Sequence, residues 1–187
     1  MRQSAHDVLM KVELVNARFT DLIKLRFPWL VVGLTGGLMA SFIISQFELS
    51  LRENISLAFF ISVIAYMSDA MGTQTETVFI RAITDLKFNI TKYIFREVGI
   101  GLTLGGIFGV LAGIVASLIA NSSQVGIVVG LSLFLSMTVA SLFACLTPIV
   151  LKSFKQDPAV GSGPFTTAIQ DLVSLTIYFT IATLVLR

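Results

Sequence analysis

Five long apolar stretches determine what this chain of 187 residues can fold into. Each stretch is long enough to cross about 30 Å of hydrocarbon as an α-helix. Only 13% of the residues are charged, whereas about a quarter of the residues of a soluble domain carry a charge. Pro28 near the start of the first span suits an early helical turn, and Pro164 opens the fifth span in the same way. We therefore predict an all-α membrane protein whose residues 27–187 form one transmembrane domain, with spans at about 27–47, 55–80, 94–120, 125–151 and 165–186.

The segment before the first span shows a different pattern. Its apolar residues recur at spacings of three and four with charged residues between them, namely Val8, Val12, Val15, Phe19, Leu22 and Ile23. This spacing is typical of an amphipathic helix that buries one face. We predict that residues 1–26 form such a helix on the cytoplasmic side. Two roles stay open, a simple anchor and a plug below a pore, and the pattern favours the anchor because it shows only that one face is buried.

Lysine and arginine are divided unequally between the two sides of the predicted spans. Of the 13 Lys and Arg residues, only Arg52 and Arg187 fall on one side, and the other 11 fall on the opposite side. Cytoplasmic segments of membrane proteins are enriched in these two residues. We therefore predict a multi-pass protein of the cell membrane, with the N-terminus in the cytoplasm and the C-terminus outside the cell.

Asp171 is the most unusual residue of the fifth span, because an ionised carboxylate at membrane depth costs roughly 2.5–3.5 kcal/mol on insertion scales. No basic residue lies beside it in that span. Thr167 adds a hydroxyl and a backbone carbonyl one turn earlier, and Gly163 and Ser174 share the face. Mg²⁺ and Ca²⁺ prefer such oxygen ligands. We predict a metal site at Asp171 and Thr167, with Gly163 and Ser174 lining the pore.

A homodimer would place two copies of Asp171 opposite each other. Two-fold dimers are the commonest closed oligomers, and two carboxylates balance the charge of one divalent cation. Mg²⁺ sheds water reluctantly, so a few carboxylates would hold it through retained water molecules. Such loose binding permits release, which conduction requires. If the fifth span lies near a two-fold axis, the expected ligand is therefore one hydrated divalent cation between the two carboxylates.

The second span carries polar residues that lipid cannot accommodate. Asp69, Thr73 and Glu76 follow at i, i+4 and i+7, so they share one face, and Gly72 borders that face. Carboxylates at this depth line a water-filled path or pair with basic groups. We include Asp69 and Glu76 among the candidate metal ligands and Gly72 and Thr73 among the pore-lining residues. For Glu76, a pore role and pairing with Arg81 are equally well supported.

Two further features concern the third and fourth spans. Glu97 opens the third span near the cytoplasmic interface, where we expect a solvated glutamate, or else a contribution to the inner mouth of the pore. Small residues recur every four positions in both spans, at Gly101, Gly105, Gly109 and Gly113 and at Ser132, Ser136, Ala140 and Ala144. Such stripes let helices approach closely, so these two spans are expected to pack tightly.

Several function classes are excluded by what the sequence lacks. The single cysteine, Cys145, allows neither a disulfide framework nor a cysteine-based zinc site. The sequence contains no nucleophile–base arrangement, phosphate-binding loop or nucleotide fingerprint. We therefore do not expect an enzyme or a nucleic-acid partner, and the expected environment is the lipid bilayer.

Three motifs together resemble the membrane domain of the MgtE-type magnesium transporters. They are RFPWLVVGL at the first span, GTQTETVFIRAI at the second and DPAVGSGPFTTAIQDLVSLTIYF at the fifth, and the resemblance covers about residues 26–186. It implies a homodimer with a pore at the dimer axis, lined by the second and fifth helices. It also implies that Asp171 binds hydrated Mg²⁺, aided by the carbonyl of Thr167, and that Mg²⁺ enters passively along the membrane potential.

The chain departs from this family in two respects. Family members carry cytoplasmic CBS sensor domains before the membrane part, whereas about 26 residues precede the first span here; a separate CBS-type protein is a possible regulatory partner. The family usually reads GGNAGTQ where this chain reads SDAMGTQ. The additional Asp69 and Glu76 make a Na⁺- or H⁺-coupled divalent cation exchanger the alternative function. A non-transporting membrane subunit that partners a sensor protein is the third.

Overall fold

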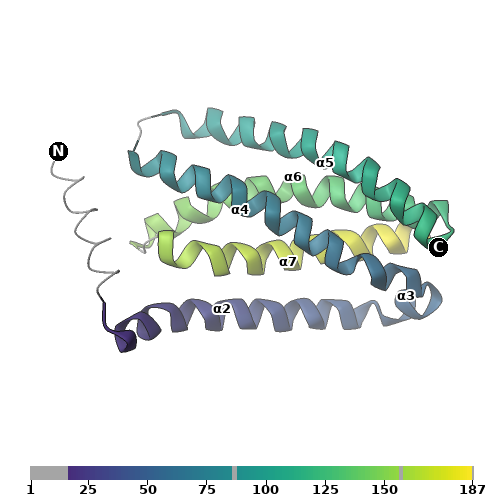
Figure 1. The fold of residues 1–187 in the computed structure, drawn as a ribbon, viewed down its shortest axis with the longest axis horizontal. Coiled ribbons are helices and arrows are strands. Elements are labelled where there is room, and N and C mark those ends of the chain that lie inside the picture. The colour runs from purple at the N-terminus through teal and green to yellow at the C-terminus, as the bar shows by residue number, and fades with distance from the viewer. Residues whose placement is uncertain (1–16, 86–87, 156–157, 187) are drawn as a thin grey trace.

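The computed structural model describes residues 17–85, 88–155 and 158–186 of the chain, and every regular element in them is a helix (Figure 1). The predicted all-α fold with five apolar helices is confirmed. Residues 1–16, which hold most of the predicted amphipathic segment, lie outside the described residues. The elements in chain order are α2 (Phe19–Gln46), α3 (Glu48–Glu53), the 3₁₀ helix η1 (Ile55–Phe60), α4 (Ile61–Asp85), α5 (Ile90–Ala120), α6 (Ser123–Ser153) and α7 (Pro158–Val185).

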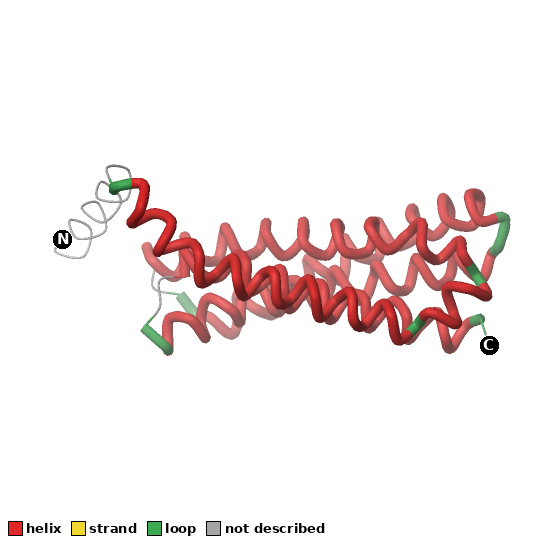
Figure 2. The backbone as a smooth tube through the Cα atoms, turned by 90° about the horizontal axis from the view of Figure 1, so that it is seen from below, coloured by secondary structure: helices red, strands yellow, loops and turns green. Residues whose placement is uncertain are grey.

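The long helices lie side by side along the long axis of the molecule, as the two perpendicular views show (Figures 1 and 2). Short connections reverse the chain between them. Asn89 caps α5 by accepting a 3.0 Å hydrogen bond from the Lys92 amide. Asn121 ends α5 in the left-handed conformation, at φ 49°, and Ser122 then caps α6. Two residues therefore suffice to make α5 and α6 an antiparallel pair.

Two helices start earlier than the sequence pattern indicates. Helix α2 begins at Phe19, so residues 19–26 continue directly into the first span and Pro28 lies inside the helix. Helix α7 begins at Pro158, which likewise places Pro164 beyond the first turn. Pro164 therefore does not open the fifth helix, and Pro28 lies well inside α2 rather than in an early turn. Hydropathy locates the apolar part of a helix, whereas the helix itself extends into the polar flanks.

The predicted close packing of the third and fourth spans is confirmed. A Cβ added at Gly109 would lie 2.6 Å from the carbonyl oxygen of Gly130, and one at Gly113 would lie 2.9 Å from that of Gly126. Glycine therefore allows the backbones of α5 and α6 to touch. The small residues of α6 that begin at Ser132 face α4 instead. There the hydroxyl of Ser68 on α4 donates a 3.4 Å hydrogen bond to the Ser136 carbonyl.

Helix α6 is the centre of the bundle, with α4, α5 and α7 packed around it. Helix α2 packs chiefly along α7, where Gly36 faces Ala168 and Gly161 faces the ring of Trp29. Helix α7 therefore lies between α2 and the rest of the bundle (Figure 1). The hydroxyl of Tyr178 donates a 2.8 Å hydrogen bond to the Leu57 carbonyl, which ties α7 to η1 at one end.

Candidate ion-binding site

Asp69, Thr167 and Asp171 come together where α4 and α7 run antiparallel. The hydroxyl of Thr167 donates a 2.7 Å hydrogen bond to Oδ1 of Asp69. Asp171 lies one turn further along α7 and is close enough to Asp69 for the two carboxylates to interact electrostatically. All three side chains are half-buried. The structure therefore unites three of the four predicted metal ligands on one side of the subunit.

This side of α7 is not covered by any other helix of the described chain. Gly163, Thr167 and Asp171 follow at intervals of four residues and share a face. Gly163 is exposed, and a Cβ added there would meet no atom within 4 Å. Thr73 of α4 is exposed as well. A partly exposed strip with two carboxylates is too costly to face lipid at membrane depth, so in the membrane it must be covered by another polar surface or by water.

The described residues contain no complete metal site. Among the described residues, no three His, Cys, Asp or Glu side chains come close enough to hold a metal ion. The two ion pairs within 4.0 Å in that part of the chain involve neither Asp69 nor Asp171. The strip thus offers two carboxylates without a basic partner, together with the Thr167 carbonyl one turn before Asp171.

Glu76 does not join this strip. Its side chain is only 7% exposed and lies near the hydroxyls of Ser162 and Thr166 on α7. Pairing with Arg81, one of the two alternatives for Glu76, is not found, because neither residue takes part in an ion pair within the described ranges, and Arg81 is exposed. The helical spacing of seven residues placed Asp69 and Glu76 on one face, but they meet different parts of α7.

Two of the predicted pore-lining residues are buried inside the subunit. Gly72 packs beneath the side-chain amide of Gln170, which a Cβ at Gly72 would displace. Ser174 is 1% exposed, and its hydroxyl donates a 3.3 Å hydrogen bond to the Asp171 carbonyl. In this structure, packing accounts for Gly72, while Ser174 lies beneath the backbone of Asp171.

Glu97 is buried, with 6% exposure, so the expectation of a solvated glutamate is wrong. It accepts a 3.1 Å hydrogen bond from the hydroxyl of Thr75 on α4, and the guanidinium of Arg96 lies 3.8 Å from its other oxygen. Although Glu97 is near the start of α5, the close approach of α4 covers it. Glu97 therefore ties α5 to α4 at Thr75, the residue that precedes Glu76.

The sequence reasoning missed a second polar row on α7. Ser162, Thr166 and Gln170 are each at most 2% exposed and face the interior of the subunit. Their spacing of four residues was visible in the sequence. The row gives a weaker signal than Asp171 on the neighbouring face, because hydroxyls and amides cost less at membrane depth than a carboxylate.

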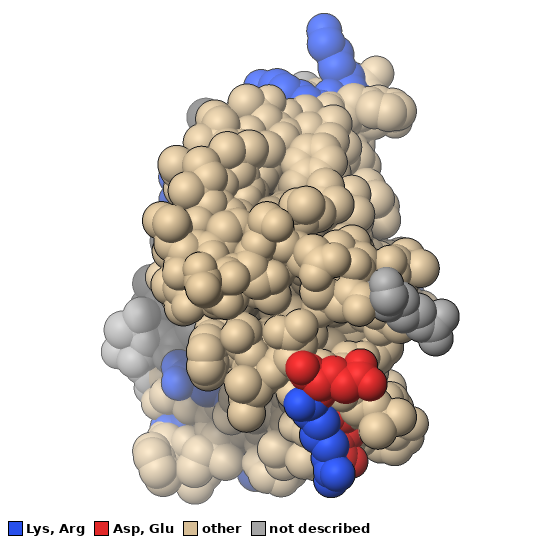
Figure 3. All heavy atoms as spheres, turned by 90° about the vertical axis from the view of Figure 1, so that its right-hand side faces the viewer, with Lys and Arg blue, Asp and Glu red and all other residues tan. Residues whose placement is uncertain are grey.

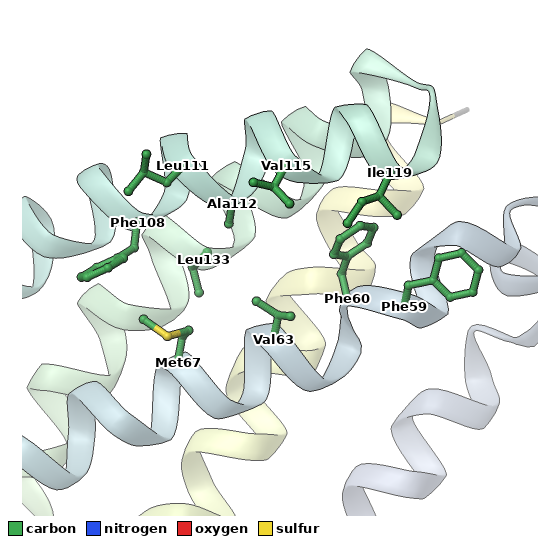
Figure 4. A pocket seen from close by; sticks show the side chains of 10 residues that line it. All are labelled: Phe59, Phe60, Val63, Met67, Phe108, Leu111, Ala112, Val115, Ile119 and Leu133. Atoms are coloured by element: carbon green, nitrogen blue, oxygen red, sulfur yellow. The ribbon is translucent and has the colours of Figure 1, made fainter.

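A separate crevice of about 440 Å³ opens between α4 and α5 (Figure 4). Ten apolar side chains from η1, α4, α5 and α6 line it, including Phe60, Met67 and Phe108. No charged or hydroxyl side chain points into it. Because a cation needs oxygen ligands, this crevice is not an ion site.

Comparison with known proteins identifies the family to which this helical bundle belongs. The family model MgtE, described as a divalent cation transporter, matches residues 61–181. The chain is 38% identical over 161 residues to the magnesium transporter MgtE of Bacillus subtilis, a match that covers 84% of this chain and 36% of the relative.

Two further relatives are the magnesium transporters MgtE of Enterococcus faecalis, 37% identical, and of Thermus thermophilus, 32% identical. Each match covers 87% of this chain and 36% of the relative. The chain thus spans about a third of the length of the curated relatives it matches. Together with the five apolar helices, these matches show that the chain is a membrane protein of the MgtE family, whose members are transporters and not enzymes.

Proposed function

We propose that two copies of this chain form a pore for Mg²⁺, with the two Asp171 carboxylates facing a hydrated ion on the two-fold axis. The observation that carries this proposal is the half-exposed strip of Asp69, Thr167 and Asp171 at membrane depth. A second copy of the strip would cover the first without exposing either to lipid. The names of the relatives, all magnesium transporters, support Mg²⁺ as the ion.

The chemistry of the strip suits a cation that keeps its water. Two Asp171 carboxylates supply the charge that balances one Mg²⁺, and the Thr167 carbonyls add acceptors for its bound water molecules. Thr167 also fixes one oxygen of Asp69 through its 2.7 Å hydrogen bond. Asp69 then adds negative potential beside Asp171, which attracts the ion without replacing its hydration shell. Water-mediated contact allows the ion to leave again.

The distribution of charge supports the proposed orientation. The end of the bundle at α3 shows a largely uncharged surface with one group of charges of both signs (Figure 3), and there Arg52 pairs with Glu48 at 2.6 Å. Lys24, Arg81 and Arg96 lie near the other end of the bundle, away from α3. With that end in the cytoplasm, a potential of 100 mV, negative inside, would favour Mg²⁺ entry by about 4.6 kcal/mol.

One observation favours coupled exchange as a second candidate. Glu76 is a buried carboxylate without an ion pair among the described residues, on the same helix as Asp69. Such a group is a common element of cation-coupled carriers. In that case the movement of Mg²⁺ would depend on a Na⁺ or proton gradient. A separate CBS-type protein remains the proposed regulatory partner in either case.

Flux through the purified chain tests the proposal. We expect proteoliposomes that contain the chain and a Mg²⁺-sensitive dye to take up Mg²⁺ faster than empty vesicles, and faster still with a negative interior. Parallel measurements with Ca²⁺, Mn²⁺ and Co²⁺ report the selectivity. If uptake requires an opposing Na⁺ or proton gradient, the protein is a coupled exchanger rather than a passive pore. The absence of flux for all four ions would contradict both and favour the non-transporting subunit.

A further inference from the structure

The second polar row of α7 forms a cluster with Glu76 that the Mg²⁺ strip does not use. We propose that Glu76, Ser162, Thr166 and Gln170 bind one Na⁺ ion inside each subunit. This inner site is distinct from the strip at Asp171, although both lie between α4 and α7. Thr166 and Thr167 are neighbours in sequence, and a rotation of about 100° per residue directs one to each site.

The inner site is built from oxygen-bearing side chains that are closed off from the surface. Glu76 is 7% exposed, Gln170 is 2% exposed, and Ser162 and Thr166 are each 1% exposed. The hydroxyls of Ser162 and Thr166 lie near the Glu76 carboxylate. Gln170 lies one turn further along α7 and packs on Gly72, which lies one turn before Glu76 on α4. The antiparallel helices thus place these four groups in one stretch of their interface.

Two of these buried oxygens are poorly satisfied. Oε1 of Gln170 makes no hydrogen bond with any described residue, and Oγ1 of Thr166 makes none of ordinary length and angle, although it lies near the Glu76 carboxylate. The amide nitrogen of Gln170 donates to the Ala140 carbonyl at 3.4 Å. Because a carbonyl can only accept, this contact fixes which end of the amide is the free acceptor. A buried acceptor without a partner costs about 1–3 kcal/mol, so a ligand that accepts these lone pairs would stabilise the cluster.

The charge of the inner site selects a monovalent cation. Glu76 is the one carboxylate of the cluster, and no Lys or Arg of the described residues pairs with it within 4.0 Å. Asp69 of the strip lies close enough to add negative potential. One monovalent ion makes the cluster neutral, whereas a divalent ion would leave an excess positive charge in a low-dielectric interior. Carboxylate, hydroxyl and amide oxygens suit a hard cation. Because α4 and α7 approach each other closely at Gly72, we assign the site to Na⁺ rather than to the larger K⁺.

Thermal unfolding of the purified chain without Mg²⁺ tests this site directly. We expect the Tm to rise with NaCl and to saturate, because a ligand that binds only the folded state stabilises it. KCl and choline chloride at the same ionic strength should not reproduce the rise. Glu76→Gln should abolish it, and Thr166→Val should raise the apparent Kd about tenfold, whereas the matched control Thr166→Ser should leave it near the wild-type value.

The outcome also separates this site from the proposed Mg²⁺ pore. Asp171→Asn should keep the full Na⁺ effect, so the inner site stands even if Mg²⁺ transport is not found. A Tm that does not respond to Na⁺, or a Na⁺ effect that survives Glu76→Gln, would overturn the proposal. An equal response to K⁺ would overturn the assignment to Na⁺. If Glu76→Gln fails to fold, binding of radioactive Na⁺ to the Thr166→Val and Thr166→Ser pair decides the question.

Discussion

Replacing Asp171 by asparagine is expected to lower Mg²⁺ flux at least about a hundredfold, equivalent to about 2.7 kcal/mol in the barrier. The asparagine side chain keeps the size of aspartate but removes one negative charge per subunit, and so both charges that face the ion in the proposed dimer. A hydrated Mg²⁺ ion would then enter the low-dielectric centre of the membrane without compensation. Dye-loaded proteoliposomes with matched protein content measure the effect.

The matched control is Asp21→Asn, the same substitution at an exposed aspartate in the first turn of α2. It should leave the flux within about twofold of the wild type, because surface charges in water contribute little. Asp69→Asn should fall between the two, since Asp69 adds potential without facing the ion directly. Undiminished flux in Asp171→Asn would show that Mg²⁺ passes elsewhere.

Replacing Gly109 by leucine is expected to prevent stable assembly of the bundle. Even a Cβ at this position would lie 2.6 Å from the Gly130 carbonyl oxygen of α6. Backbone cannot yield as a flexible side chain does, so α5 and α6 must separate. Overpacking of this kind costs about 1–3 kcal/mol or more, and this pair holds one side of the bundle together. Thermal unfolding in detergent, followed by circular dichroism, should show a much lower Tm or no folded protein.

Gly99→Leu on the same helix provides the matched control. A Cβ at Gly99 would meet no atom within 4 Å, and replacing a helical glycine removes a helix-propensity cost of roughly 0.8–1.0 kcal/mol. The Tm of Gly99→Leu should therefore equal or exceed that of the wild type. Equal losses in the two variants would show that close contact between α5 and α6 is not what the glycine stripe provides.

The number and position of the spans could be predicted because hydropathy depends on local composition. The glycine stripe of α5 was equally legible, since small residues every four positions have one consistent use in membranes. The helix ends were not, because α2 and α7 continue beyond their apolar parts, through Pro28 and Pro164. Helical periodicity predicts which residues share a face of a helix. The apolar pattern does not show where the helix ends within its polar flanks.

The candidate site was predicted only in part, for a related physical reason. Asp69, Thr167 and Asp171 lie together because α4 and α7 are neighbours, and their role as metal ligands stays a prediction. Glu97 is buried rather than solvated, and Glu76 is buried away from Arg81. Their burial depends on which helix covers them, and the covering partners, Thr166 of α7 and Thr75 of α4, lie far away in sequence. Spacing within one helix cannot reveal such contacts.

The central claim is that two Asp171 residues share one ion, and the stoichiometry of Mg²⁺ binding measures this most directly. Calorimetric titration of the purified chain with Mg²⁺, with the oligomeric mass determined by light scattering, counts bound ions per chain. We predict a dimer with one Mg²⁺ for every two chains at the Asp171 site, and loss of that ion in Asp171→Asn. One Asp171-dependent ion per chain, or binding that survives the substitution, would contradict the shared site.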